Sequence, residues 1–235
     1  MRIIIAVFCI FLSVMPASAE WAGEIYGGVA KTSKADVTDT SSLGLTATVT
    51  DVKLDASGTV GGRIGYWFPE FAGLASFGMG LDAFVFGADI DQQTVPVQFG
   101  GFSGTGTLNR VDVEVLGIGF DVLKLRLHLS KSEQYPQGQL QPYATAGPAL
   151  FRAKFKDTNN VTPNHQSESD TALGVKVGLG LQYLVTSNIG LFGEYRFTHF
   201  TADASFQDTT APASTETLSS TFNTHHLVGG LAFHF

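Results

Sequence analysis

The feature that most constrains this chain is a period of two in its hydrophobic residues. In residues 173–183, apolar side chains at every second position alternate with small or polar ones: Leu173, Val175, Val177, Leu179, Leu181 and Tyr183. Successive side chains of a β-strand point to opposite faces, so the segment predicts a strand with one apolar face. A helix would mix Lys176 and Gln182 among the leucines, and each glycine inside it would cost about 1 kcal/mol. The helical interpretation therefore fails.

The same period recurs along the chain and predicts eight strands. Their approximate ranges are 21–31, 59–67, 74–89, 107–127, 140–156, 173–183, 189–205 and 227–235. Polar connections at 32–58, 90–106, 157–171 and 206–222 alternate with shorter ones at 68–70, 130–139 and 186–188. This sorting is typical of an outer-membrane barrel, and an apolar outer face requires closure because unpaired edge groups in hydrocarbon cost several kcal/mol each. We predict an all-β fold: a closed, antiparallel transmembrane β-barrel of eight strands, with long extracellular loops and short periplasmic turns.

Composition excludes two other classes of protein. The mean hydropathy is +0.15, yet the only long apolar run lies at the N-terminus, so a bundle of transmembrane helices is excluded. The net charge of −7, without a basic stretch, argues against nucleic acid as a partner.

The N-terminus has the pattern of an export signal. Met1 and Arg2 precede an apolar run, and Ala17-Ser18-Ala19 forms a small-residue cleavage site. A retained anchor is the alternative, but nothing after Ala19 continues the apolar run. We therefore expect residues 1–19 to be a cleaved signal peptide and residues 20–235 to be the barrel domain. The single cysteine, Cys9, falls inside the signal, so the mature chain has no disulfide and no thiolate.

Charged residues on the polar faces of the strands are expected to point into the barrel. They are Glu24, Arg63, Asp82, Asp112, Glu114, Arg152, Lys176, Glu194 and Arg196. Their signs nearly balance, and a barrel of eight strands is just wide enough to be filled by side chains, so we expect paired charges rather than a wide pore. Near Gly117–Asp121 the alternation fails, because the phase set by Val113 and Val115 would turn Asp121 toward lipid. That failure predicts either a β-bulge or a strand that has left the membrane at this point.

Three short motifs resemble those of small porin-family, OmpA-like outer-membrane proteins. They are Pro142-Tyr143 followed by Gly147, Glu194-Tyr195-Arg196-Phe197-Thr198, and the closing residues 228–235. The resemblance implies an outer-membrane location. It also implies that the terminal aromatic residues, Phe233 and Phe235, belong to the signal read by the barrel assembly machinery. His199 stands where the family usually has Asp.

These observations predict a non-enzymatic protein with a structural or surface-interaction role in the cell envelope of a Gram-negative bacterium, acting through its extracellular loops. No catalytic, metal or cofactor site is expected, since consecutive His225 and His226 point to opposite strand faces. His128 is expected to lie in a solvated connection. Expected partners are outer-membrane lipid, lipopolysaccharide and, through Phe235, the assembly machinery; no nucleic acid is expected, and the barrel is expected to be a monomer.

Two alternatives remain open. One is a narrow channel or carrier for small or hydrophobic solutes, in which Arg63, Lys176 and Arg196 would select ions. The more remote one is a lipid-modifying enzyme that uses His199, Thr201 and Ser205.

Overall fold

The fold was analysed in a computed structural model, which describes residues 19–41, 46–71, 73–108, 110–157, 167–207 and 215–235. The predicted signal peptide, apart from Ala19, lies outside these residues. Within the described residues, no helix is long and apolar enough to cross a membrane.

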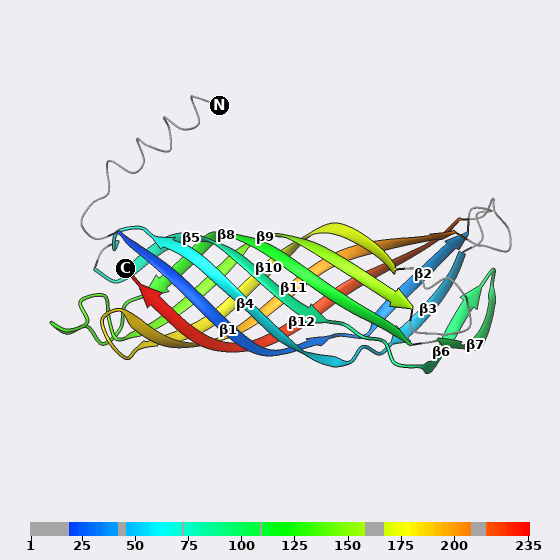
Figure 1. The fold of residues 1–235 in the computed structure, drawn as a ribbon, viewed down its shortest axis with the longest axis horizontal. Helices are drawn as coiled ribbons and strands as arrows, with labels where there is room; N and C mark the ends of the chain where they lie inside the picture. Colours follow the sequence, from blue (N-terminus) through cyan, green and yellow to red (C-terminus); the bar gives the residue numbers. More distant parts are fainter. Residues whose placement is uncertain (1–18, 42–45, 72, 109, 158–166, 208–214) are drawn as a thin grey trace, which may run out of the picture.

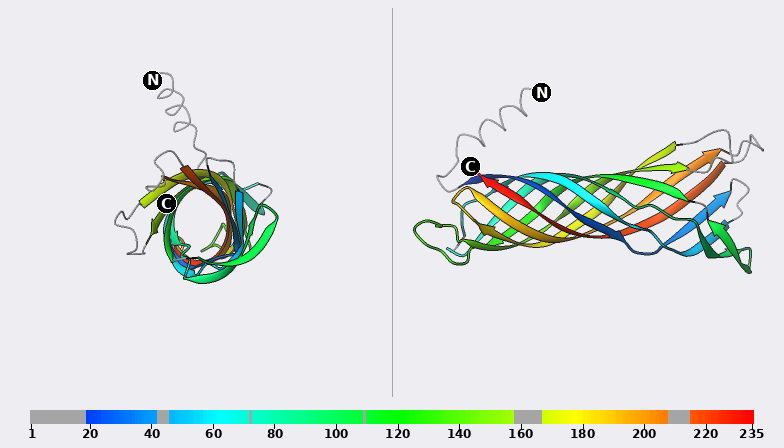
Figure 2. Two further views of the ribbon diagram at one scale, coloured as in Figure 1. Left: turned by 90° about the vertical axis from the view of Figure 1, so that its right-hand side faces the viewer. Right: turned by 60° about the horizontal axis from the view of Figure 1, so that its bottom comes forward.

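Eight long antiparallel strands form a closed barrel, as predicted (Figures 1 and 2). They are β1 (Glu20–Thr32), β4 (Ala56–Trp67), β5 (Ala75–Gly87), β8 (Val111–Leu127), β9 (Leu140–Asp157), β10 (Ser167–Leu184), β11 (Ile189–Gln207) and β12 (Thr215–His234). Each pairs with its neighbour in chain order, and β1 pairs with β12 from Ala22 opposite His234 to Thr32 opposite Thr224. This last pairing leaves the barrel without a free edge at membrane depth.

Four further strands extend the wall at the end away from the chain termini (Figure 1). They are β2 (Ala35–Ser41), β3 (Thr46–Val52), β6 (Gln93–Phe99) and β7 (Phe102–Leu108), and they follow β12 in the order β2-β3-β6-β7. The prediction of plain loops at 32–58 and 90–106 is therefore wrong. These segments are rich in threonine and valine, which favour strands, and β12 offers a pairing edge above the barrel.

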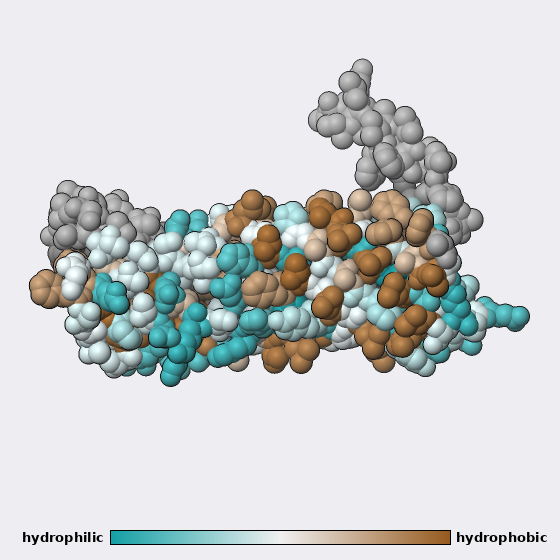
Figure 3. Space-filling model, turned by 180° about the vertical axis from the view of Figure 1, so that it is seen from behind, coloured by the Kyte–Doolittle hydropathy of each residue, from teal (hydrophilic) through white to brown (hydrophobic). Residues whose placement is uncertain are grey.

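The outer surface divides into an apolar and a polar half. Exposed apolar side chains cover the half that carries the termini (Figure 3). On β10 they run from Leu173 to Tyr183, which matches the roughly 9–11 residues that a tilted strand needs to cross a bilayer. On β9 the outward series ends at Leu150, and β11 continues beyond it with the exposed residues His199 and Thr201. The outward apolar residues end at one level of the barrel, and we call this level the membrane boundary. The end of the barrel that carries the long connections lies outside the cell.

Both interpretations of the irregular pattern in β8 apply: inward and outward residues alternate in phase from Val113 to Asp121 as the strand leaves the membrane, and a bulge follows at Val122 and Leu123. The pairing of β8 with β9 shifts register between Gly119 and Leu123, and both Val122 and Leu123 are exposed on the outside. The bulge brings the β8 backbone so close to β9 that a Cβ at Gly147 would overlap the Phe120 carbonyl group. Only glycine fits at position 147.

Candidate functional site

Eight charged side chains meet inside the barrel at membrane depth, and we call them the ionic layer. Four are cations and four are anions: Arg63, Lys124, Lys176, Arg196, Glu24, Asp82, Asp121 and Glu194. None is more than 8% exposed. Six of the nine predicted lumen charges lie in this layer. The bulge adds the other two, because it lets Asp121 and Lys124 both point inward.

Arg63 is the centre of the ionic layer. Strand register places it directly opposite Glu24 on β1 and Asp82 on β5. Its guanidinium donates to both carboxylate oxygens of Glu194, at 2.8 and 3.0 Å, and lies 3.2 Å from Glu24 Oε2. It also lies 3.7 Å from Asp82 and from Asp121. One cation thus holds carboxylates from four other strands.

Most of the remaining contacts join residues of different strands across the lumen. Lys176 Nζ lies 2.5 Å from Asp82 Oδ2 and 2.9 Å from Asp121 Oδ1. Arg196 donates to Glu194 at 2.8 Å and to the Tyr26 hydroxyl at 2.8 Å, and Tyr26 donates in turn to Asp82 at 2.5 Å. Because removing a charge from water costs several kcal/mol, such a layer is tolerated only when each charge has partners of opposite sign.

The sequence prediction is wrong for Asp112, Glu114 and Arg152, which point out of the barrel. The Glu114 side chain is 66% exposed and that of Asp112 38%, and Arg152 is also exposed. The inward positions of the same strand segments hold Val113, Val115 and Phe151, each at most 1% exposed. These segments lie beyond the membrane boundary, where water surrounds the outer face and the apolar side chains turn inward.

Directly above the ionic layer the lumen holds a second group, which we call the aromatic layer. Its members are Phe84, Phe86, Phe151, Phe200, Phe222 and His226, none more than 3% exposed. Phe200 stacks between Phe151 and Phe222, with ring centroids 4.3 and 4.9 Å away. His226 meets Phe86 edge to face at 4.9 Å. The sequence signal was present at Phe84 and Phe86, where both faces of β5 are apolar.

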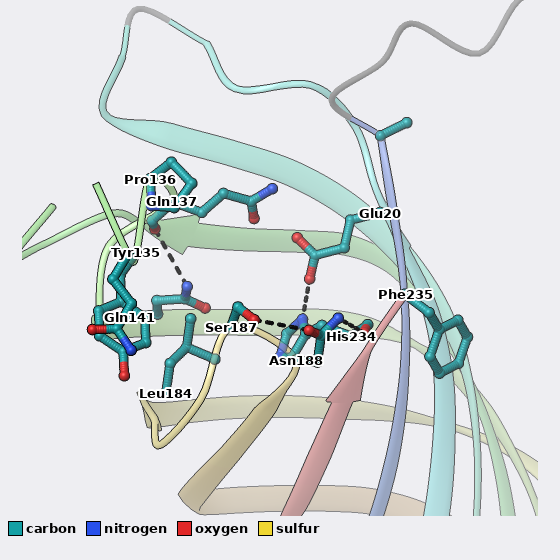
Figure 4. A pocket seen from close by; sticks show the side chains of 12 residues that line it. Glu20, Tyr135, Pro136, Gln137, Gln141, Leu184, Ser187, Asn188, His234 and Phe235 are labelled. Atoms are coloured by element: carbon teal, nitrogen blue, oxygen red, sulfur yellow. Dashed lines mark hydrogen bonds and ion pairs between the residues drawn. The ribbon is translucent and has the colours of Figure 1, made fainter. Parts of the chain in front are cut away.

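The periplasmic mouth holds a pocket of about 240 Å³ (Figure 4). Its wall includes Glu20, Gln137, Gln141, Asn188 and His234. Glu20 bonds to His234, and Asn188 donates to the His234 carbonyl at 2.8 Å. The buried Arg126 of β8 donates to Glu20 at 3.1 Å and to Gln137 at 2.8 Å. These bonds join the first residue of β1 and the last residue of β12 to the turn after β8.

A serine, a histidine and a carboxylate lie in line near the same mouth. Ser76 Oγ is 3.0 Å from His128 Nε2, and His128 Nδ1 is 3.1 Å from Glu70 Oε2. Lys131 Nζ, 2.5 Å from Glu70, lowers the pKa of that carboxyl group, and burial lowers the pKa of His128. His128 is only 4% exposed, so its predicted solvation is wrong. The order matches that of a hydrolytic triad, but the Ser76 side chain is buried, with only 2% of the residue exposed.

The other candidate residues lie apart. His225 is outside the barrel, 2.6 Å from the Tyr195 hydroxyl, while His226 is inside, as predicted for neighbours on a strand. His199 bonds to Asn223 at 2.7 Å on the outer face, and the side chain of Ser205 is outside the described residues. In the described part of the chain, no three histidine, cysteine or acidic side chains are grouped to hold a metal. Phe235 is 70% exposed, and its backbone pairs with Trp21.

Comparison with known proteins identifies the class. A family model described as the outer membrane protein beta-barrel domain matches residues 4–235, so the chain belongs to this family and its location is the outer membrane. The crystal structure of OprG from Pseudomonas aeruginosa is similar, with a TM-score of 0.52 and 15% identity over 93% of this chain and 96% of that one. The outer membrane protease OmpT from Escherichia coli also has a TM-score of 0.52, with 9% identity over 93% and 98% of the two chains. These identities show a shared fold only. Comparison with curated protein sequences gives no significant match.

Proposed function

We propose that this protein is a closed, non-conducting and non-enzymatic outer-membrane barrel that acts through its extracellular part. The observation that carries the proposal is the filling of the lumen by two successive layers. Ions would have to displace the ionic layer, whose charges are already paired four against four, and then the stacked rings of the aromatic layer. This arrangement favours a structural or surface-interaction role over the alternative of a channel.

The extracellular part offers a surface for contact. The β6–β7 hairpin turns at Gly100 and Gly101, both with positive φ, which suits glycine in a tight hairpin. The flanking Phe99 and Phe102 are 46% and 81% exposed. Two aromatic rings at the tip of a polar hairpin are suited to contact with a partner surface.

The direct test is conductance of the refolded barrel in a planar lipid bilayer. A heat-dependent shift in gel mobility would first establish that the barrel has folded. We expect no discrete current steps, whereas reproducible steps from the folded protein would overturn the proposal and support the channel.

The non-enzymatic part of the proposal has its own test. Because Ser76 is buried, a serine-directed fluorophosphonate should not label the folded barrel. Labelling that disappears in Ser76→Ala would show that the triad-like group is accessible, and would contradict this part of the proposal.

A further inference from the structure

Three cations occupy successive outward positions on β9, immediately beyond the membrane boundary. They are Arg152, Lys154 and Lys156, all exposed, and we call them the cationic stripe. Leu150, the outward residue before them, is 51% exposed and lies opposite Ile118 on β8 and Leu173 on β10. The stripe therefore begins where the outward apolar residues end on β9 and β10, at the level of the outer-leaflet headgroups. On β8 one more apolar residue, Leu116, is exposed and lies opposite Arg152.

Only part of the stripe is neutralised by neighbouring acids. Lys156 lies 3.8 Å from Glu114, and Asp112 is held by Arg110 at 3.1 Å. Strand register also places Glu114 opposite Lys154, but among the side chains that the structure describes no carboxylate oxygen lies within 4.0 Å of Arg152 or Lys154.

The neighbours of Arg152 and Lys154 on β10 are hydroxyl groups. Strand register places Thr171 opposite Arg152 and Ser169 opposite Lys154, and both are exposed. Two cations beside two hydroxyl donors form a surface suited to a phosphate group. Lys31, the outward cation on β1, differs because it already donates to the Leu54 carbonyl at 2.7 Å.

The lipid-facing surface below the stripe is also distinctive. The outward residues of β9 at this depth are alanines and prolines: Pro142, Ala144, Ala146 and Pro148. Larger residues flank them, since Ala144 lies between Leu125 and Leu179, and Ala146 lies between Leu123 and Val177. An acyl chain lying along β9 would contact side chains on both sides and lead up to Arg152.

We propose that Arg152 and Lys154, with Thr171 and Ser169, bind a phosphate group of a phosphorylated glycolipid in the outer leaflet. The acyl chains of the lipid would lie along β9. The inference uses the outer-membrane location and the wall of the barrel, and it does not depend on whether the lumen conducts.

The test is a binding titration of the folded barrel in detergent, followed by native mass spectrometry. The probes are bisphosphorylated lipid A and the same lipid with both phosphates removed. Arg152→Gln/Lys154→Gln should weaken binding of the phosphorylated probe by about 30-fold, and the wild type should bind the dephosphorylated probe about as weakly.

The matched control is Lys31→Gln/Lys34→Gln, which removes two positive charges at the same end of the barrel. It should keep wild-type affinity, and heat-dependent gel mobility would verify that all variants are folded. Equal affinity of Arg152→Gln/Lys154→Gln and wild type would overturn the proposal. So would equal affinity of the wild type for the two lipids, or an equal loss of affinity in the control.

Discussion

The part of the barrel wall inside the membrane and the part outside it have opposite polarity. Below the membrane boundary, β8 turns Ile118 outward and Asp121 inward; above it, the same strand turns Glu114 outward and Val115 inward. The alternation stays in phase between these residues, so the strand has not rotated. What changes is the surroundings: lipid outside and charges inside at one level, water outside and aromatic rings inside at the other.

This contrast teaches that an alternating pattern assigns residues to the two faces of a strand but does not show which of the two faces points outward. The outward face is set by what surrounds each segment. In a strand longer than the bilayer is thick, the two halves meet different surroundings and must be assigned separately.

The largest expected effect comes from removing the central cation of the ionic layer. Arg63→Gln leaves Glu24 and Glu194 without their main partner and should lower the free energy of unfolding by about 3–5 kcal/mol. Arg152→Gln makes the same chemical change on the outside, above the boundary, and should alter it by less than about 0.5 kcal/mol. Urea unfolding in lipid vesicles measures both, and similar losses would contradict the inside–outside assignment.

A charge introduced on the outer face of a single strand should have different effects at membrane depth and above the membrane boundary. Leu179→Arg, at membrane depth on β10, should cost about 2–4 kcal/mol or prevent insertion. Ser169→Arg, on the same face above the boundary, should fold normally. The measurement is the yield of the heat-modifiable folded form, and equal yields would place the boundary elsewhere.

The third effect concerns the aromatic layer. Phe200→Leu loses two stacked contacts and should cost about 1–2 kcal/mol. Phe197→Leu, three residues earlier on the outward face of β11, is the matched control. We expect it to change the unfolding free energy little, and a larger loss in the control would argue against an aromatic filling of the lumen.

The smallest effect is a pH dependence at the periplasmic end. Burial lowers the pKa of His128 from its ordinary value of 6.5, so the unfolded chain takes up the proton at a higher pH than the folded barrel does. The contribution of His128 is therefore complete above pH 6.5 and decreases as the pH falls. The stability difference between wild type and His128→Gln should shrink between pH 7.5 and pH 5.5; a difference that grows on acidification would contradict this.

The sequence predicted the eight strands and six of the lumen charges because each strand segment at membrane depth faces lipid on one side and the polar lumen on the other. Glu24, Arg63 and Glu194 could be placed from alternation alone. Asp112, Glu114 and Arg152 could not, since the rule of polar inside and apolar outside ends at the boundary. The position of the bulge depends on how β8 meets β9 at Gly147, a contact between segments far apart in the chain, and no local pattern reports it.

Cysteine labelling on β11 tests most directly the opposite polarity of the barrel wall inside and outside the membrane. The experiment is practicable because the single cysteine of the sequence lies within the predicted signal. Single cysteines would be placed at Leu191, Phe200 and Thr201 of the folded, membrane-inserted barrel and exposed to a membrane-impermeant maleimide. We predict rapid labelling at position 201 and protection at position 191, which faces lipid. Position 200 should also be protected, because it lies in the filled lumen above the boundary. Labelling at position 200 as fast as at position 201 would show that water enters the lumen there, and would contradict the two-layer account.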